Sequence, residues 1–251
     1  MPTDQLIAVT GASGALGRLV VNRLLNLVPA ERIIAVVRDP AKVADLAARG
    51  VTVRTGDYDR PQSLDLQGVD RLLLISSPEL DADKRTGQHR NVIEAAADVR
   101  LLVYTSFLTP DGAHQATEAA IRAGGRAYTF LRNPFYTDAF VQTGDHLASG
   151  TGGGALNTAT RANLAEAAAA VLTGEAHHHN RAYDLTGPLW TFPGVAEAIG
   201  VPYREEAPAG AMGFLHGLAK AGRLERQTDD LETLLGRPPT TAVEAFRAAR
   251  R

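Results

Sequence analysis

Three glycines near the start of the chain have the spacing of a phosphate-binding turn. Gly11, Gly14 and Gly17 directly follow the apolar run Leu6–Thr10 and open a stretch with helical spacing. We expect Gly11 to form a tight turn, Gly14 to let the backbone approach a pyrophosphate, and Gly17 to let the helix pack against the sheet. The N-terminus of such a helix has unpaired N–H groups and a partial positive charge, which suit an anion. The candidate contacts of this dinucleotide-binding loop are Gly11, Ser13, Gly14, Ala15, Leu16 and Gly17.

The end of the second apolar run, Ile33–Val37, indicates which dinucleotide would bind. NAD sites usually have an acidic residue there, about 20 residues beyond the glycine turn, which binds the ribose 2′-hydroxyl. This chain has Arg38 instead, followed by Asp39, and an arginine can hold a 2′-phosphate with paired donors. Lys42 lies one turn into the next helix and could assist, whereas Asp39 could cap that helix or still accept NAD. The sequence therefore favours NADP(H) over NAD(H).

Polar residues at the ends of the other apolar runs could complete a binding groove. The candidate cofactor contacts there are Asp57, Tyr58, Ser76, Ser77, Asn133, Pro134, Phe135 and Tyr136. Residues of these types also favour turns, so each could serve a chain reversal alone. Three catalytic roles are suggested by placement at strand ends. Tyr104 and Asn133 could stabilise a developing oxyanion, and His114, whose pKa is ordinarily near neutrality, could donate a proton.

The elements that must position these residues alternate along the first half of the chain. Apolar runs predict strands at Leu6–Thr10, Ile33–Val37, Val51–Thr55, Arg71–Ile75, Leu101–Ser106 and Tyr128–Arg132. Helical spacing predicts helices at Leu16–Leu27, Ala41–Arg49, Gln88–Ala97 and His114–Ala123, the first of which would bury Leu16, Leu19, Val20, Leu24 and Leu27 on one face. This alternation is typical of a parallel sheet with right-handed crossovers and helices on both faces. The fold class is therefore α/β, a Rossmann-type doubly wound parallel sheet that binds ligands at the carboxyl ends of its strands.

The regular alternation of strand and helix patterns ends after Asn133, so we expect two domains. The first, residues 1–133, is the NADP-binding Rossmann domain, to which some later segments return, and residues 134–251 form a smaller, mostly helical C-terminal domain for the substrate. Thr160 could cap a helix that ends at Gly174. A strand is expected at Arg181–Leu185, a helix between Trp190 and Gly200, and short helices from Met212 onward.

Composition excludes several classes of protein. With 251 residues, 45% of them hydrophobic and 22% charged, the chain is globular rather than disordered. Lys+Arg is 26 and Asp+Glu is 28, so no basic nucleic-acid footprint is indicated. There is no cysteine, which excludes a disulfide scaffold, a thiolate zinc site and a catalytic cysteine. Neither a signal peptide nor a membrane-spanning run is visible, so we expect a cytoplasmic protein without a membrane partner, either a monomer or a homodimer.

One histidine run resembles a metal site without having its geometry. His177–His179 are consecutive, and neighbours on an extended segment point to opposite faces. We therefore expect a solvated loop before a strand and no metal site.

Several motifs together resemble a known family. The segments "VTGASGALG", "VVRDP", "GDYD", "LLLISS", "QHRNVIEAA", "YTS" and "LRNPFY" are similar to the NmrA-like atypical short-chain dehydrogenases, closest to the type 2 NAD(P)H:quinone oxidoreductases. "TATRANLAEAAAAVL", "YDLTGPLWT" and "LLGRPPTTAVEAF" extend the resemblance over most of the chain. It implies NADPH bound by the Gly11–Gly17 loop, Arg38, Ser76, Ser77 and Asn133–Tyr136, a smaller domain over the nicotinamide, and hydride transfer to a quinone. It also implies that Arg161 lies on the substrate side.

Two departures from the wider family keep other functions open. The Tyr-x-x-x-Lys pair is missing, since Tyr104 is followed four residues later by Leu108. The helix lysine that follows "H-x-x-T-E" in relatives is replaced by Ala119. An alternative is therefore a catalytically weak NADP(H)-binding redox sensor that acts through a protein partner. A sugar-nucleotide epimerase and an ether reductase are disfavoured by the same two absences. No flavin or metal motif is visible, so an enzyme of this kind would transfer the hydride directly to a quinone-like acceptor.

Overall fold

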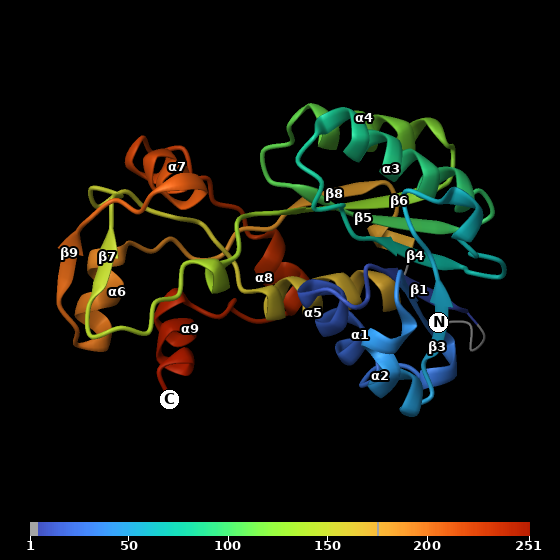
Figure 1. Cartoon of the computed structure of the whole chain (residues 1–251), viewed down its shortest axis with the longest axis horizontal. Helices are drawn as coiled ribbons and strands as arrows, with labels where there is room; N and C mark the ends of the chain where they lie inside the picture. The colour runs from blue at the N-terminus through green and yellow to red at the C-terminus, as the bar shows by residue number, and fades with distance from the viewer. Residues whose placement is uncertain (1–4, 175) are drawn as a thin grey trace. The chain divides into compact units, whose positions relative to one another are not determined.

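The central sheet has buried apolar strands in its middle and partly exposed strands at its two edges. The structure is a computed structural model that describes residues 5–174 and 176–251. Within these residues the sheet has seven parallel strands in the order β3-β2-β1-β4-β5-β6-β8 (Figure 1). The strands are β1 Ile7–Thr10, β2 Ile33–Val37, β3 Thr52–Thr55, β4 Arg71–Leu74, β5 Leu101–Phe107, β6 Ala127–Asn133 and β8 Arg181–Asp184. The predicted Rossmann-type α/β fold is confirmed.

Helices cover both faces of this sheet, as a buried parallel sheet requires. Figure 1 shows α3 and α4 on one face and α1 and α5 on the other. The bounds are α1 Ala15–Leu24, α2 Ala44–Ala48, α3 Ala82–Ala95, α4 Gly112–Ala123 and α5 Arg161–Thr173, with short 3-10 helices η1 Ala30–Arg32, η2 Pro40–Val43, η3 Pro61–Ser63 and η5 Ala176–His178. Alternate strand residues such as Ala8, Leu72, Leu102 and Phe130 enter one buried cluster with Val92 of α3.

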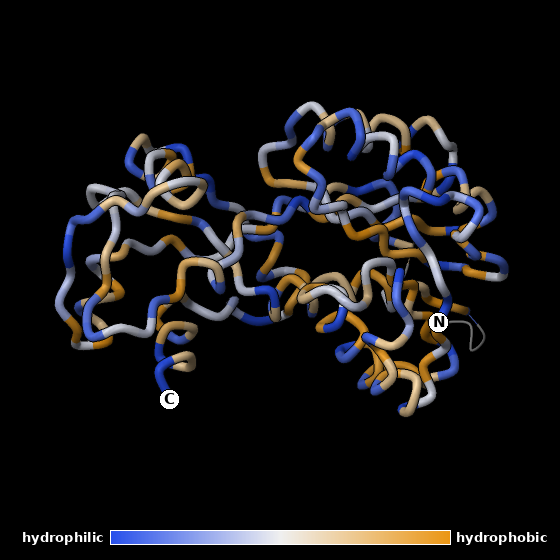
Figure 2. The backbone as a smooth tube through the Cα atoms, viewed as in Figure 1, coloured by the Kyte–Doolittle hydropathy of each residue, from blue (hydrophilic) through white to orange (hydrophobic). Residues whose placement is uncertain are grey.

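Two helices on opposite faces of the sheet, α3 and α1, differ in polarity. The tube of α3 is largely hydrophilic in Figure 2, whereas α1 is largely hydrophobic. This explains why the apolar spacing predicted α3 only from Gln88, while the helix begins at Ala82 with the Asp81 side chain accepting from Lys84 N at 2.8 Å. The predicted apolar face of the first helix is partly wrong: Leu19 in α1 is 37% exposed, and Leu27, which lies beyond the end of α1, is 48% exposed.

The chain divides into two compact units. One contains the chain up to Asn133 together with Leu164–Asp184, and the other contains Pro134–Asn163 and Leu185–Arg251. The second unit has a two-stranded parallel sheet, β7 Leu147–Ser149 and β9 Tyr203–Glu205, which the sequence did not predict. Its helices are η4 Thr137–Ala139, α6 Phe192–Ile199, α7 Gly210–Lys220, α8 Asp230–Leu235 and α9 Ala242–Ala249.

The core of the second unit is aromatic. Trp190, Phe192 and Phe246 lie in one buried cluster, with ring centroids 5.0 Å apart for Trp190 and Phe192. The predicted cap of α5 is confirmed, since Thr160 Oγ1 accepts from Asn163 N at 3.2 Å. The strand predicted from Arg181 is β8, which begins at that residue. The helix predicted to stop near Gly200 is α6, and Gly200 is its left-handed C-cap.

The histidine run is only in part the solvated loop that the sequence predicted, since His177 is exposed but His178 is buried. His178 is 8% exposed, and its Nδ1 lies 2.9 Å from Tyr183 Oη. His178 is the last residue of the 3-10 helix η5, which the sequence did not predict. Among the described residues, no group of three or more His, Asp or Glu side chains is arranged to hold a metal. None of the described helices combines the length and the apolarity that crossing a bilayer would need.

Candidate functional site

The glycine turn has the backbone that a bound pyrophosphate needs. Gly11 has φ +60°, a left-handed conformation that favours glycine, and Gly14 N donates to Gly11 O at 2.9 Å. Gly14, in an extended conformation, is the N-cap residue of α1, and no described side chain caps the helix. The first N–H groups of α1 are therefore left for an anion, which is the observation by which this turn fits a phosphate.

Gly17 has a different role from the one predicted. A Cβ at this position would clash with Gly11 O and lie 2.9 Å from Ala12 Cα. The absent side chain therefore lets α1 pack against the glycine turn itself rather than against the sheet. Ser13 is half-buried, Ala15 is exposed, and the Leu16 side chain is buried in the core. Only the backbone of Leu16 can face a ligand.

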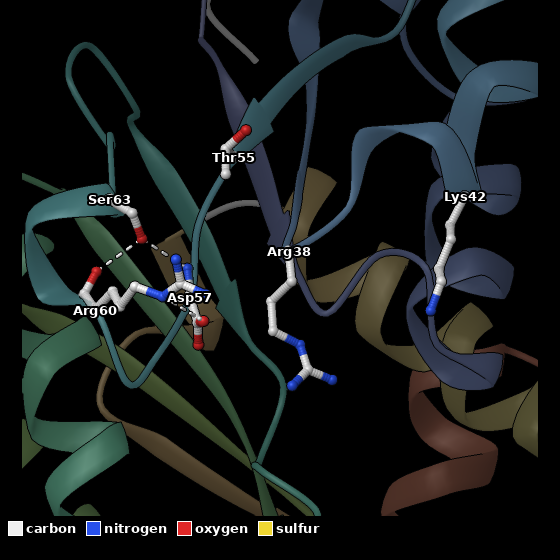
Figure 3. A pocket seen from close by; sticks show the side chains of 6 residues that line it. All are labelled: Arg38, Lys42, Thr55, Asp57, Arg60 and Ser63. Atoms are coloured by element: carbon white, nitrogen blue, oxygen red, sulfur yellow. Dashed lines mark hydrogen bonds and ion pairs between the residues drawn. The ribbon is translucent and has the colours of Figure 1, made fainter.

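A polar cavity lies at the carboxyl ends of β2 and β3. It has a volume of about 340 Å³ and is lined by Arg38, Lys42, Thr55, Asp57, Arg60 and Ser63 (Figure 3). The side chains of Arg38 and Lys42 make no hydrogen bond or ion pair with any described residue. Asp39 caps η2, since its Oδ1 accepts from Ala41 N at 3.1 Å and Pro40 takes the first helical position. The acidic residue that could have bound an NAD ribose is thus engaged in a helix cap.

Tyr58 is held by neighbouring strands rather than free beside an adenine. Its hydroxyl donates to Thr10 Oγ1 at 2.5 Å and to Ile75 O at 2.8 Å, two alternatives for a single proton. Burial raises the pKa of Tyr58, so the phenol keeps its proton. Of the predicted pair, Asp57 lines the cavity at β3, and Tyr58 braces the ends of β1 and β4.

The loop after β4 is fixed by a buried histidine that the sequence did not mark. Ser77 N donates to His89 Nε2 at 2.9 Å, and His89 Nδ1 lies 2.9 Å from Thr117 Oγ1. Burial lowers the pKa of His89 to about 3, so the ring is neutral, with its proton on Nδ1. Ser76 N donates to Thr105 Oγ1 at 2.9 Å. The Ser77 hydroxyl donates to Gln88 Oε1 at 2.5 Å, so it is already engaged.

The predicted catalytic pair lies inside the fold. Tyr104 is fully buried and lies within β5, not at its end, because the strand continues to Phe107. Its hydroxyl lies 2.7 Å from Nδ1 of His114, which is 7% exposed. Burial raises the pKa of Tyr104 and lowers the pKa of His114. The two side chains join β5 to α4.

Asn133 is at the end of β6, as predicted, and has an unpaired acceptor. The residue is 5% exposed, and its Oδ1 has no hydrogen-bond partner among the described residues. A buried acceptor without a partner is costly, so it marks a position at which a ligand donor would be stabilising. The chain then continues through Pro134, buried, and Phe135 into the second unit. There the Arg161 guanidinium lies 4.2 Å from the Tyr136 ring centroid.

A buried ion pair beside Asn133 is a further feature that the sequence did not predict. Arg132 Nε and Nη2 donate to Glu118 Oε1 and Oε2 at 2.9 and 2.8 Å, and Ser106 Oγ donates to Oε1 at 2.8 Å. The sequence marks Glu118 only as part of "H-x-x-T-E". The network ties α4 to β5 and β6.

Comparisons with known proteins agree with this geometry. A model of NAD(P)H-binding proteins matches residues 11–175. The chain is 37% identical over 280 residues to quinone oxidoreductase 2 of Escherichia coli (strain K12), covering 96% of this chain and 97% of that protein. The chain belongs to the NmrA-like family of NAD(P)H-binding oxidoreductases. The predicted family is confirmed, and so is the prediction that the chain is an enzyme; a redox sensor without turnover is not favoured.

Two solved structures of oxidoreductases with bound cofactor have the same architecture. The Citrobacter sp. triphenylmethane reductase complexed with NADP(H) has a TM-score of 0.90 and 36% identity, over 97% of this chain and 99% of that one. The E. coli quinone oxidoreductase QOR2 complexed with NADPH has a TM-score of 0.85 and 35% identity, over 98% of this chain and 100% of that one. The individual site residues of this chain stay predictions.

Proposed function

We propose that this protein transfers a hydride from NADPH directly to a quinone or a similar carbonyl acceptor. The observation that carries the proposal is the cavity at the ends of β2 and β3, where the side chains of Arg38 and Lys42 are cations without a partner among the described residues. The glycine turn is tied to the same strand, since Ala12 N donates to Val36 O at 3.4 Å. A pyrophosphate on the turn and a 2′-phosphate beside Arg38 would use both features.

The residues of this chain would hold NADPH in three places. The Gly11–Gly17 backbone would take the pyrophosphate, Arg38 and Lys42 the 2′-phosphate, and the loop at Ser76 and Asn133 the nicotinamide end. When bound, the nicotinamide supplies the hydride, and no flavin or metal is required. A quinone accepts a hydride readily, so catalysis rests chiefly on holding donor and acceptor in a reactive geometry.

Asn133, Tyr104 and His114 would have unequal roles in this reaction. Asn133 has a buried acceptor at the strand end and would orient the cofactor or the acceptor. Tyr104 and His114 are buried, so they would act by fixing β5 against α4, and water would protonate the hydroquinone anion. Alanine at Asn133 should lower turnover about tenfold or more with the fold intact. Tyr104→Phe should change turnover less than Asn133→Ala; the reverse order would contradict these roles.

The second unit would supply the acceptor site. Arg161 is bonded within that unit through its backbone N to Asp138 Oδ2 at 2.8 Å, and its guanidinium covers Tyr136. A guanidinium above an aromatic ring offers donors to a carbonyl oxygen beside an apolar surface. The acceptors that the relatives are named for, a quinone and triphenylmethane dyes, have conjugated rings, which fit an aromatic surface.

The test is to follow NADPH absorbance with the purified protein and a set of simple quinones, with NADH in parallel. Quinone-dependent oxidation that is faster with NADPH than with NADH is the expected result. Thermal stabilisation by NADPH should accompany it, because a ligand that prefers the folded state raises the melting temperature. Stabilisation without oxidation of any acceptor would instead support the redox-sensor alternative.

A further inference from the structure

Arg60 contributes a third cation to the cavity that contains Arg38 and Lys42. It follows β3 and directly precedes η3, and nothing in the sequence motifs marked it as a cofactor residue. Figure 3 shows Arg38 between Lys42 on one side and the Asp57–Arg60 pair on the other. Arg60 Nε lies 3.3 Å from Asp57 Oδ2. The same cavity therefore holds three cations and one carboxylate that is paired.

The Asp57 carboxylate places a negative charge in a cavity proposed to bind a phosphate. Asp57 is only 16% exposed at its side chain, so its charge acts within the cavity rather than being dispersed in water. A 2′-phosphate carries a charge of nearly −2 at neutral pH, and an unpaired carboxylate in the same cavity would repel it. Arg60 cancels the Asp57 charge at the site where the phosphate would sit.

The local backbone holds this pair in place. Ser63 Oγ is the centre of the turn: Asp57 N donates to it at 2.9 Å, and it donates to Arg60 O at 2.7 Å. Asp57 Oδ1 accepts from Asp59 N at 3.1 Å. The Asp57 carboxylate is thus oriented by the turn, while the Arg60 guanidinium, 72% exposed, keeps its remaining donors available to a ligand.

Other charged residues nearby are already engaged. Arg18 donates to Asp45 Oδ2 at 2.6 Å and to Lys42 O, so it braces the backbone of Lys42 and is not a further phosphate ligand. The Asp59 carboxylate accepts from Gln88 Nε2 at 2.9 Å. The charge that a 2′-phosphate meets is set by Arg38, Lys42 and the Asp57–Arg60 pair.

We propose that Arg60 determines specificity for the phosphorylated dinucleotide by neutralising Asp57 in the 2′-phosphate cavity. The inference rests on the proposed use of this cavity for NADPH. Without Arg60 the cavity would keep Arg38 and Lys42 but present a bare carboxylate beside them, so discrimination between NADPH and NADH would fall. The non-phosphorylated cofactor would be affected little.

The test measures the dissociation constants of 2′,5′-ADP and 5′-AMP by calorimetry, because their ratio reports the 2′-phosphate and cancels contacts to adenine. Arg60→Gln should lower this preference for 2′,5′-ADP about five- to tenfold, the scale of one partly exposed charged interaction. Because the Arg60 guanidinium is exposed, the loss should be smaller at high salt. Arg60→Lys, which keeps the charge, should lose less.

Arg100→Gln is the matched control. Arg100 Nε lies 3.4 Å from Asp70 Oδ1 in a similarly exposed arginine–aspartate pair outside the cavity. This variant should leave the preference unchanged. Melting temperatures of both variants would show that each is folded.

The double variant Asp57→Asn, Arg60→Gln tests the mechanism. If Arg60 acts by neutralising Asp57, removing the carboxylate should restore the preference to within about twofold of the wild type. A double variant as weak as Arg60→Gln, or an Arg60→Gln preference equal to wild type, overturns the proposal. If the wild type itself does not prefer 2′,5′-ADP to 5′-AMP, then the proposed NADPH function fails as well. A wild type that has this preference, with Arg60→Gln unchanged, means that only the Arg60 proposal fails.

Discussion

At the scale of single residues, Arg38 is the side chain that should separate the two cofactors. Its guanidinium has no partner in the described structure, so replacing it costs the folded protein little. Arg38→Gln should raise the KM for NADPH about 10- to 100-fold, the value of one charge-assisted, paired contact to phosphate. The KM for NADH should change by less than about threefold. Steady-state rates with both cofactors and one quinone check this; equal losses for NADPH and NADH would exclude a 2′-phosphate contact.

Ala119 of α4 stands where relatives have a lysine, and its position shows which contacts that replacement can affect. Ala113, His114, Thr117, Glu118 and Ile121 form the buried side of α4, whereas Ala119 is exposed. Neither the Tyr104–His114 contact nor the Glu118–Arg132 pair involves position 119. The missing helix lysine therefore removes no group from these buried contacts.

At the scale of elements, the contact between α1 and the glycine turn should be intolerant of a single methyl group. In Gly17→Ala the new Cβ would clash with Gly11 O and lie 2.9 Å from Ala12 Cα, both backbone atoms that cannot rotate away. We expect a loss of stability of about 2–4 kcal/mol and loss of NADPH binding. Thermal unfolding with and without NADPH measures both effects.

Gly87 in α3 offers a control of the same substitution in a helix. A Cβ there would meet nothing within 4 Å. Gly87→Ala should therefore raise stability by about 0.5–1 kcal/mol, the ordinary helix preference for alanine, and leave binding unchanged. Equal stability of the two variants would show that the turn tolerates a side chain.

The Glu118–Arg132 pair should make the attachment of α4 depend on pH. Burial opposes ionisation of Glu118, but hydrogen bonds from Arg132 and Ser106 outweigh it and lower its pKa below the usual 4.5. A lowered folded pKa means that the stabilisation is present above about pH 4.5 and is lost as the pH falls through the folded pKa. Glu118→Gln should cost about 2 kcal/mol at pH 7, because Arg132 loses the carboxylate that both its Nε and Nη2 contact and keeps only the longer Asp184 contact at 3.4 Å.

Melting temperatures of wild type and Glu118→Gln from pH 7 to pH 3 would test this. The gap between the two proteins should be constant above about pH 5 and should narrow below about pH 4. Glu94→Gln, an exposed residue of α3, serves as control and should change stability by less than about 0.5 kcal/mol. A gap that stays constant down to pH 3 would show that the charge of Glu118 contributes nothing.

Local sequence patterns were sufficient to predict the elements with a clear apolar pattern. They could not predict elements and residues that are defined by contacts between distant parts of the chain. The apolar runs of β1, β2 and β4 are buried at every position, so their type and bounds could be predicted from sequence. The strands β7 and β9 have three residues each and pair across more than 50 positions, so no local period marks them. His89 and Glu118 have partners on other elements, Ser77 and Arg132, and spacing along the chain does not indicate such contacts.

At the scale of the whole molecule, the two units have different sequence signals. The first unit follows the alternation of strands and helices, which limits the topology to a parallel sheet with right-handed crossovers. The second unit is organised around the Trp190–Phe192 aromatic cluster, which no periodic pattern indicates. The proposal that this unit binds the acceptor therefore rests on the contact between Arg161 and Tyr136. The cofactor residues, in contrast, could be predicted from sequence motifs.

Direct hydride transfer makes a demand on the whole chain, because NADPH and the acceptor must be bound at the same time. Initial rates at varied NADPH and quinone should therefore give intersecting double-reciprocal lines, the pattern of a ternary complex. A resident flavin would instead be reduced by NADPH before the quinone binds, which gives parallel lines. Denatured protein should release no stoichiometric flavin, and added FMN or FAD should not raise the rate. Parallel lines together with a released flavin would contradict direct transfer while leaving the NADPH-binding residues in place, since the same turn and cavity would then serve the reduction of the flavin.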